Sequence, residues 1–296
     1  THYHMDLIFR KTFLLFCIAQ SISLALGTKF LNFAENADDL ALGAHPSLGG
    51  SAVVNPSLIR REYESPIFFV NSGNWYGDIS ISGLNYFHKI GNLNNRLFLK
   101  QAEINDLEFR GSEPSDDPNA MFSAYGFQLG SGFSIKNTLG DFGVSLSYLS
   151  IGIYDQSSKG FIIDLGFSKL LSNGWGFGLS VLNLGHITKL YQEVPKLPTL
   201  FLIGGSKDFR FLKTNNKFYT TAEYSAVDTM WKLKLGLDFG LEKIKILTGY
   251  SIDEHTTSFS FGGGVSSGRF GITYAIKFGS QKIGSPKVLS LSYILP

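Results

Sequence analysis

Residues 231–241 read W-K-L-K-L-G-L-D-F-G-L, and this strict alternation constrains the fold more than any other stretch. Its odd-numbered positions are all apolar, and its even-numbered positions are lysine, glycine or aspartate. A helix turns by about 100° per residue and would scatter the leucines around its axis, whereas a strand puts alternate side chains on opposite faces. The length also matches the roughly 9–11 tilted residues that carry a strand across a bilayer. The stretch therefore predicts a membrane-spanning β-strand.

Similar alternation recurs through residues 65–296, as in 121–136, 141–154 and 269–278, and divides this region into about 14 strands. Short connections near 137–140, 172–174, 242–243 and 266–268 alternate with longer ones at 109–120, 188–197 and 279–286. An even strand count, with short turns at one end and longer loops at the other, is typical of bacterial outer-membrane barrels. Charged residues are only 17% of the chain and aromatic residues 14%, which suits such a barrel. We therefore predict an all-β fold, a single transmembrane antiparallel β-barrel in the bacterial outer membrane.

Two local irregularities are predicted within the strands. A tight break at Gly73 separates the first apolar segment from the second. At Leu149 the alternation changes phase, so that Leu149, Ile151 and Ile153 share one face, which indicates a β-bulge.

The first 27 residues have the three parts of a cleaved secretory signal peptide. Arg10 and Lys11 precede a mainly apolar run, and small residues offer cleavage points at Ser23, Ala25 and Gly27. An N-terminal membrane anchor is the alternative. The chain's one cysteine, Cys17, lies in this leader and lacks the small preceding residues of a lipoprotein signal, so the mature chain has no thiol for disulfides or metal.

Residues 28–64 have neither strand nor helix periodicity, and small residues and turn formers dominate them. They form either a lead-in loop or a compact hatch inside the barrel. The stretch A-L-G-A-H-P-S-L-G-G-S-A-V-V-N-P-S resembles the N-terminal signature of the PorV/PorQ family, which is similar to the FadL-type transporters. The residues that carry this hatch motif are Gly49, Gly50, Asn55, Pro56 and Ser57. Leu182-Asn183-Leu184-Gly185 with Leu197-Pro198 resembles the family's N-x-G…L-P passage.

The resemblance implies a FadL-like barrel of 14 strands with an N-terminal hatch. It also implies a non-enzymatic role in type IX protein secretion, with secreted cargo and attachment machinery as partners. The alternative is a FadL-like transporter or channel for hydrophobic small molecules. A transporter should have a continuous apolar pocket beside the hatch, whereas a secretion component should have a sealed lumen and a partner-binding outer rim.

The residues that alternation directs into the lumen are the remaining candidates for function. The polar ones are Gln128, Asp164, Lys232, Lys234, Asp238 and Lys277. They either satisfy one another as a polar plug or tune a conducting interior. Gly264-Val265-Ser266-Ser267-Gly268 matches a nucleophile-elbow pattern, but strands flank it on both sides, so we expect a hairpin turn. We predict no catalytic, cofactor or metal site, and a net charge of +2 argues against nucleic acid as a partner.

Overall fold

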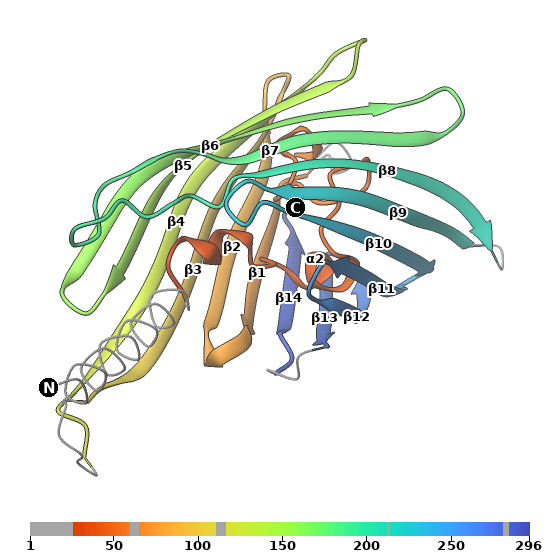
Figure 1. The fold of residues 1–296 in the computed structure, drawn as a ribbon. Coiled ribbons are helices and arrows are strands. Elements are labelled where there is room, and N and C mark those ends of the chain that lie inside the picture. Colours follow the sequence, from red (N-terminus) through yellow and green to blue (C-terminus); the bar gives the residue numbers. More distant parts are fainter. Residues whose placement is uncertain (1–25, 60–64, 111–116, 212–213, 281–283) are drawn as a thin grey trace, which may run out of the picture.

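A closed barrel dominates the computed structural model, which describes residues 26–59, 65–110, 117–211, 214–280 and 284–296. Within these residues fourteen antiparallel strands each pair with their sequence neighbours, and β1 pairs with β14 to close the ring (Figure 1). The strands are β1 (Ile67–Asn74), β2 (Ser80–Ile90), β3 (Leu93–Phe109), β4 (Ala120–Lys136), β5 (Asp141–Ile153), β6 (Gln156–Leu170), β7 (Trp175–Ile187), β8 (Leu200–Phe211), β9 (Thr214–Ser225), β10 (Met230–Leu241), β11 (Ile244–Asp253), β12 (Thr257–Ser267), β13 (Phe270–Gly279) and β14 (Lys287–Ile294). The closed barrel and its fourteen strands confirm the predicted antiparallel β-barrel of about 14 strands.

The alternation of β10 appears in the structure as two distinct faces. Trp231, Leu233 and Leu235 are 57%, 56% and 43% exposed on the outside of the barrel. Lys234 on the other face reaches Glu223 of β9 inside the lumen. Apolar side chains exposed all round the outer wall are the surface that a transmembrane barrel presents to lipid.

The connections differ between the two ends of the barrel. The end that carries the connections at 91–92, 137–140, 242–243 and 268–269, together with the C-terminus, is called the turn end here. The opposite end carries the longer connections at 110–119, 188–199 and 280–286 and is called the loop end. In outer-membrane barrels short turns face the periplasm and longer loops face outward.

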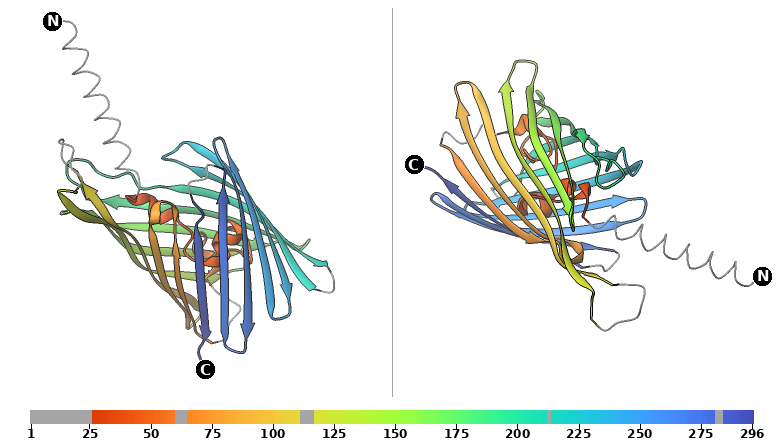
Figure 2. Two further views of the ribbon diagram at one scale, coloured as in Figure 1. Left: turned by 90° about the horizontal axis from the view of Figure 1, so that it is seen from below. Right: turned by 90° about the vertical axis from the view of Figure 1, so that its left-hand side faces the viewer.

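Residues 26–59 pass through the interior of the barrel and are called the lumen segment. At the loop end, Thr28 Oγ1 donates to the carbonyl oxygen of Lys196 at 2.6 Å. At the turn end, Ser134 Oγ donates to the carbonyl oxygen of Ile59 at 2.6 Å. The segment therefore runs the full depth of the barrel, as the red trace inside the strands shows (Figures 1 and 2).

The lumen segment contains three short helical turns, η1 (Thr28–Asn32), α2 (Ala37–Leu42) and η2 (Pro56–Leu58). Asn36 caps α2 by accepting from the Asp39 backbone N–H at 2.8 Å, and Gly43 ends it at φ 102°. The buried face of α2 packs against strands β10 to β14. None of the described helices is long and apolar enough to cross a bilayer.

The predicted break at Gly73 is wrong. β1 continues to Asn74, and the chain turns instead around η3 (Tyr76–Asp78). Gly73 is needed for close strand contact, because a Cβ atom there would lie 2.1 Å from the carbonyl oxygen of Lys287 in β14.

The predicted bulge at Leu149 is also wrong. β5 pairs with β4 without a register shift from Asp141 to Ile153. The row that faces the lumen changes from small polar residues, such as Ser145, to Leu149 and Ile151. These two side chains join the buried apolar cluster that contains Phe30 of the lumen segment, so the face is continuous and only its polarity changes.

Candidate functional site

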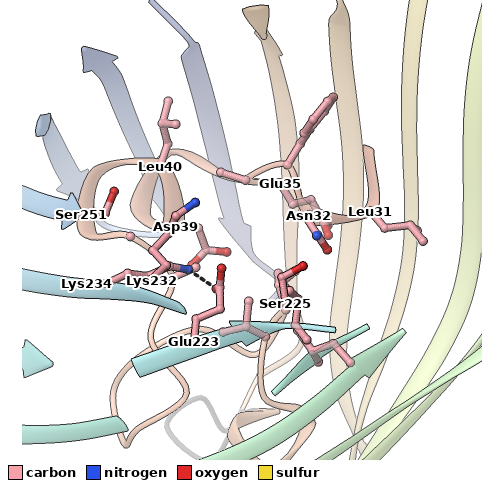
Figure 3. Close-up of a pocket in the computed structure, with 18 of the residues that line it drawn as sticks. Leu31, Asn32, Glu35, Asp39, Leu40, Glu223, Ser225, Lys232, Lys234 and Ser251 are labelled. Atoms are coloured by element: carbon pink, nitrogen blue, oxygen red, sulfur yellow. Dashed lines mark hydrogen bonds and ion pairs between the residues drawn. The ribbon is translucent and has the colours of Figure 1, made fainter. Parts of the chain in front are cut away.

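A cavity of about 250 Å³ lies between the lumen segment and the barrel wall. Apolar side chains contribute to its lining, including Leu31, Leu40, Phe98, Leu182 and Leu200. Charged side chains do so as well: Glu35, Asp39, Arg96, Lys100, Asp164, Glu223, Asp228, Lys232, Lys234, Asp253 and Lys277. Figure 3 shows Leu31, Asn32 and Glu35 of the lumen segment on one side of the cavity, and Lys232 and Lys234 on the other side together with Asp39 and Leu40 of the same segment. The cavity is therefore amphipathic, unlike the continuous apolar pocket expected of a purely hydrophobic transporter.

A buried ion pair holds the lumen segment against one wall of this cavity. Arg96 of β3 donates from Nη2 to both carboxylate oxygens of Glu35, at 3.0 and 2.9 Å, and each side chain is 3% exposed. Asn85 of β2 joins the pair by donating to Glu35 and accepting from Arg96 Nε at 2.6 Å. The guanidinium also lies 4.2 Å from the ring centroid of Phe98. Because both carboxylate oxygens of Glu35 accept hydrogen bonds from buried donors, the contact fixes the position of residue 35.

Lys100 lies four residues after Arg96 on the same face of β3. Its side chain holds the backbone of the same part of the lumen segment. Its ammonium donates to the carbonyl oxygens of Leu31 at 3.0 Å and Phe33 at 2.7 Å, and the residue is 2% exposed. Phe33 in turn stacks on Trp75 with ring centroids 4.7 Å apart. Residues 31–35 therefore form a rigid wall of the cavity.

The strand ladder is interrupted beside the cavity, between β7 and β8. β7 pairs with β8 only up to Leu182, although β7 continues to Ile187. Asn183 adopts φ 60° and donates its backbone N–H to Asp164 Oδ1 at 2.7 Å, where the β6–β7 register shifts. Its side chain donates to Pro198 and to Asn32 of the lumen segment. Beyond Leu182, side-chain contacts with the 188–199 connection replace the β7–β8 ladder.

Lysine side chains gather on the opposite wall. Lys234 Nζ lies 2.5 Å from Glu223 Oε2, and Lys232 Nζ lies 3.3 Å from Asp253 Oδ2. Lys277 of β13 lines the same cavity, close enough to both pairs for its charge to interact with theirs. The wall thus carries three ammonium groups and two carboxylates.

The hatch-motif residues lie at the turn end and do not line the cavity. Asn55 accepts from the backbone N–H of Ser57 and donates to the carbonyl oxygens of Pro46 and Phe167. Ser57 Oγ donates to Ser168 Oγ of β6 at 2.9 Å. Gly49 takes φ 81°, and a Cβ atom on Gly50 would lie 2.2 Å from the His45 carbonyl oxygen. The motif therefore fastens the lumen segment to the wall.

Alternation placed several of the polar candidates on the cavity. Gln128, Asp164, Lys232, Lys234 and Lys277 line it, but Asp238 does not. Sequence reasoning missed Glu35, Asp39, Arg96, Lys100, Glu223, Asp228 and Asp253. Two of them, Arg96 and Lys100, share one face of β3 with Phe98 and could have been found by extending the parity rule to that strand.

The lumen segment should dock in a pH-dependent way through two buried groups. Burial raises the pKa of Asp39 to about 7 and lowers the pKa of His45 to about 3. A raised carboxyl pKa means that the docked state gains a proton near pH 7 that the released state does not bind. Docking therefore strengthens by about 0.5 kcal/mol from pH 8 to 6.5, after the proton that the released His45 begins to gain is counted. Below about pH 6.5 the released His45 also gains a proton, which offsets the proton held by the docked Asp39, so docking is nearly constant until the released Asp39 titrates near pH 4 and then weakens.

The unfolding temperature in detergent, measured across pH 3–8.5, should therefore rise from pH 8 to about 6, stay level to about pH 4.5 and fall below that. Asp39→Asn should remove this rise and replace the level region by a steady fall below about pH 6.5, because His45 then titrates without compensation. A variant profile that parallels the wild type throughout would contradict this assignment.

Taken together, a closed barrel of fourteen strands whose lumen is filled by the chain's own N-terminal segment has the fold of the FadL-like outer-membrane barrels. No family model matches the chain, and no curated protein does. Among solved structures it is similar to the monoaromatic hydrocarbon channel CymD, at 12% identity over 91% of this chain and 98% of that one, with a TM-score of 0.62.

Two toluene transporters are similar in the same way. The Ralstonia pickettii transporter TbuX matches with a TM-score of 0.61 at 9% identity, over 90% of this chain and 99% of that one. The Pseudomonas putida transporter TodX matches with a TM-score of 0.59 at 11% identity, over 88% and 97%. At these identities the likeness is one of fold.

Proposed function

We propose that the protein is a passive outer-membrane channel that admits a small molecule from the loop end into the lumen cavity. The observation that carries the proposal is the cavity itself, which lies beside the lumen segment and reaches Ser225, Asp228 and Met230 at the loop end. The hydrocarbon channels and toluene transporters with the same fold support a transport function over a secretion function.

The interrupted β7–β8 ladder supplies a candidate exit from the cavity. Leu182 and Leu200, the last paired residues, line the cavity from within. Their neighbours Val181 and Phe201 line an apolar groove on the outside of the wall. A solute at this seam is separated from lipid by side chains of the 188–199 connection, because no backbone ladder closes the wall there.

Cells that lack the gene should lose uptake of small amphipathic compounds but keep normal levels of secreted proteins in the medium. Complementation with the intact gene should restore uptake. The opposite result, lost secretion with normal uptake, would contradict the channel proposal. It would favour a role in type IX secretion, which the resemblance to the PorV/PorQ family implies.

The loop-end position of Thr28 supports removal of residues 1–27 as a signal peptide. Thr28 lies beside the 188–199 connection, where its Oγ1 donates to the carbonyl oxygen of Lys196. An uncleaved anchor in the inner membrane would have to start from the turn end, which faces the periplasm in such barrels. Mass spectrometry of the purified outer-membrane protein should find an amino terminus close to Thr28.

A further inference from the structure

The ammonium group of Lys277 is the one charge on the lysine wall that the neighbouring carboxylates leave uncompensated. Strand parity directs Lys277 inward with Thr273 and Ala275, which are both buried, and its cross-strand neighbour is Ser260. Within the described part of the chain no ion pair or side-chain hydrogen bond involves its ammonium group.

The two carboxylates near Lys277 are already engaged. Glu223 accepts from Lys234, and Asp253 pairs with Lys232 while also accepting from Thr256 and from the backbone of His255. On the far wall, Glu35 is held by Arg96 and Asp164 by Asn183. A half-buried ammonium without a counter-charge is unfavourable, so this position favours an anionic group from outside the chain.

We propose that Lys277, flanked by Lys232 and Lys234, binds the carboxylate of a small organic acid in the lumen cavity. This inference rests on the proposed channel function and names its substrate class. A ligand carboxylate would complete the wall as three ammonium groups and three carboxylates. It would also accept a charge-assisted hydrogen bond from Lys277.

The rest of the cavity limits the body of the ligand. Its volume of about 250 Å³ lies below the range of about 300–1,000 Å³ that suits drug-sized ligands. Leu40, Phe98, Leu182 and Leu200 offer apolar contact away from the lysine wall. A compact apolar or aromatic body with a single carboxylate therefore fits better than a long chain or a polyvalent anion.

Benzoate and its neutral analogue benzamide test the proposal, because they share a shape and differ in charge. Binding to the purified full-length protein in detergent and flux into proteoliposomes should both favour benzoate. Lys277→Gln should weaken benzoate binding about tenfold, the loss expected when a hydrogen bond between charged groups is removed, and leave benzamide unchanged. Lys277→Arg should retain benzoate binding.

Lys243→Gln, in an exposed turn at the turn end, is the matched control and should behave as the wild type. Equal flux of benzoate and benzamide in wild type and Lys277→Gln would overturn the carboxylate site and leave the channel proposal standing. Absence of flux for both compounds, with proteoliposomes that contain folded protein, would instead overturn the channel proposal on which this inference rests.

Discussion

Arg96→Ala is expected to destabilise the docked lumen segment by about 3–5 kcal/mol, since it leaves the Glu35 carboxylate buried and without its cation. The variant also loses the contact between the guanidinium and the Phe98 ring and leaves Asn85 without its donor. Because residues 31–35 form a wall of the cavity, we expect the segment to become accessible to protease. Thermal unfolding in detergent, followed together with limited proteolysis, measures both effects.

An exposed ion pair between the same two parts of the chain provides the control. Lys29 of the lumen segment lies 3.3 Å from Asp228, and their side chains are 46% and 38% exposed. Exposed pairs contribute only about 0–1 kcal/mol, so Lys29→Ala should change the unfolding temperature little. Replacing both members of the buried pair, as in Glu35→Gln with Arg96→Met, should recover part of the loss. Equal effects of Arg96→Ala and Lys29→Ala would contradict a structural role for the buried pair.

The barrel could be predicted from sequence because its determinants are local. The alternation of residues 231–241 follows directly from the pleat of β10, and the apolar row is apolar because it meets lipid. The same rule placed Lys232, Lys234 and Lys277 inward without knowledge of their partners. It failed at Leu149, where an apolar lumen residue was interpreted as a change of face. The rule assumes a polar interior, but here Leu149 belongs to the buried cluster that includes Phe30 of the lumen segment.

The path of the lumen segment could not be predicted, because irregular backbone has no period. Glu35 meets Arg96, which is 61 positions away in the sequence, only through the course of residues 28–35 inside the barrel. Such a contact depends on where the wall is hollow. The wall is hollow where glycines such as Gly143 and Gly178 let the backbone of the lumen segment approach closely. Nothing in the sequence around these glycines shows that another part of the chain lies against them.

Gly143→Ala is expected to displace the lumen segment at the turn end and to cost about 3 kcal/mol. The new Cβ atom would lie 2.1 Å from the carbonyl carbon of Pro56 and 2.2 Å from the backbone nitrogen of Ser57. Backbone on both sides of this contact cannot rotate away as a flexible side chain would, and inserted methyl groups in packed interiors cost about 1–3 kcal/mol or more. Displacing η2 would also break the hydrogen bonds from Asn55 to Phe167 and from Ser57 to Ser168.

Gly263→Ala is the matched control, since Gly263 also lies within a strand, β12, and the nearest atom to its added Cβ is 4.0 Å away. We expect that variant to unfold within a few degrees of the wild type. Gly143→Ala should unfold at a clearly lower temperature, and proteolysis should cut residues 46–59 first, because the lost contacts lie at the turn end. Ion-pair contacts at Glu35 should persist in this variant, so cleavage of residues 31–35 as fast as that of residues 46–59 would contradict local docking of the motif.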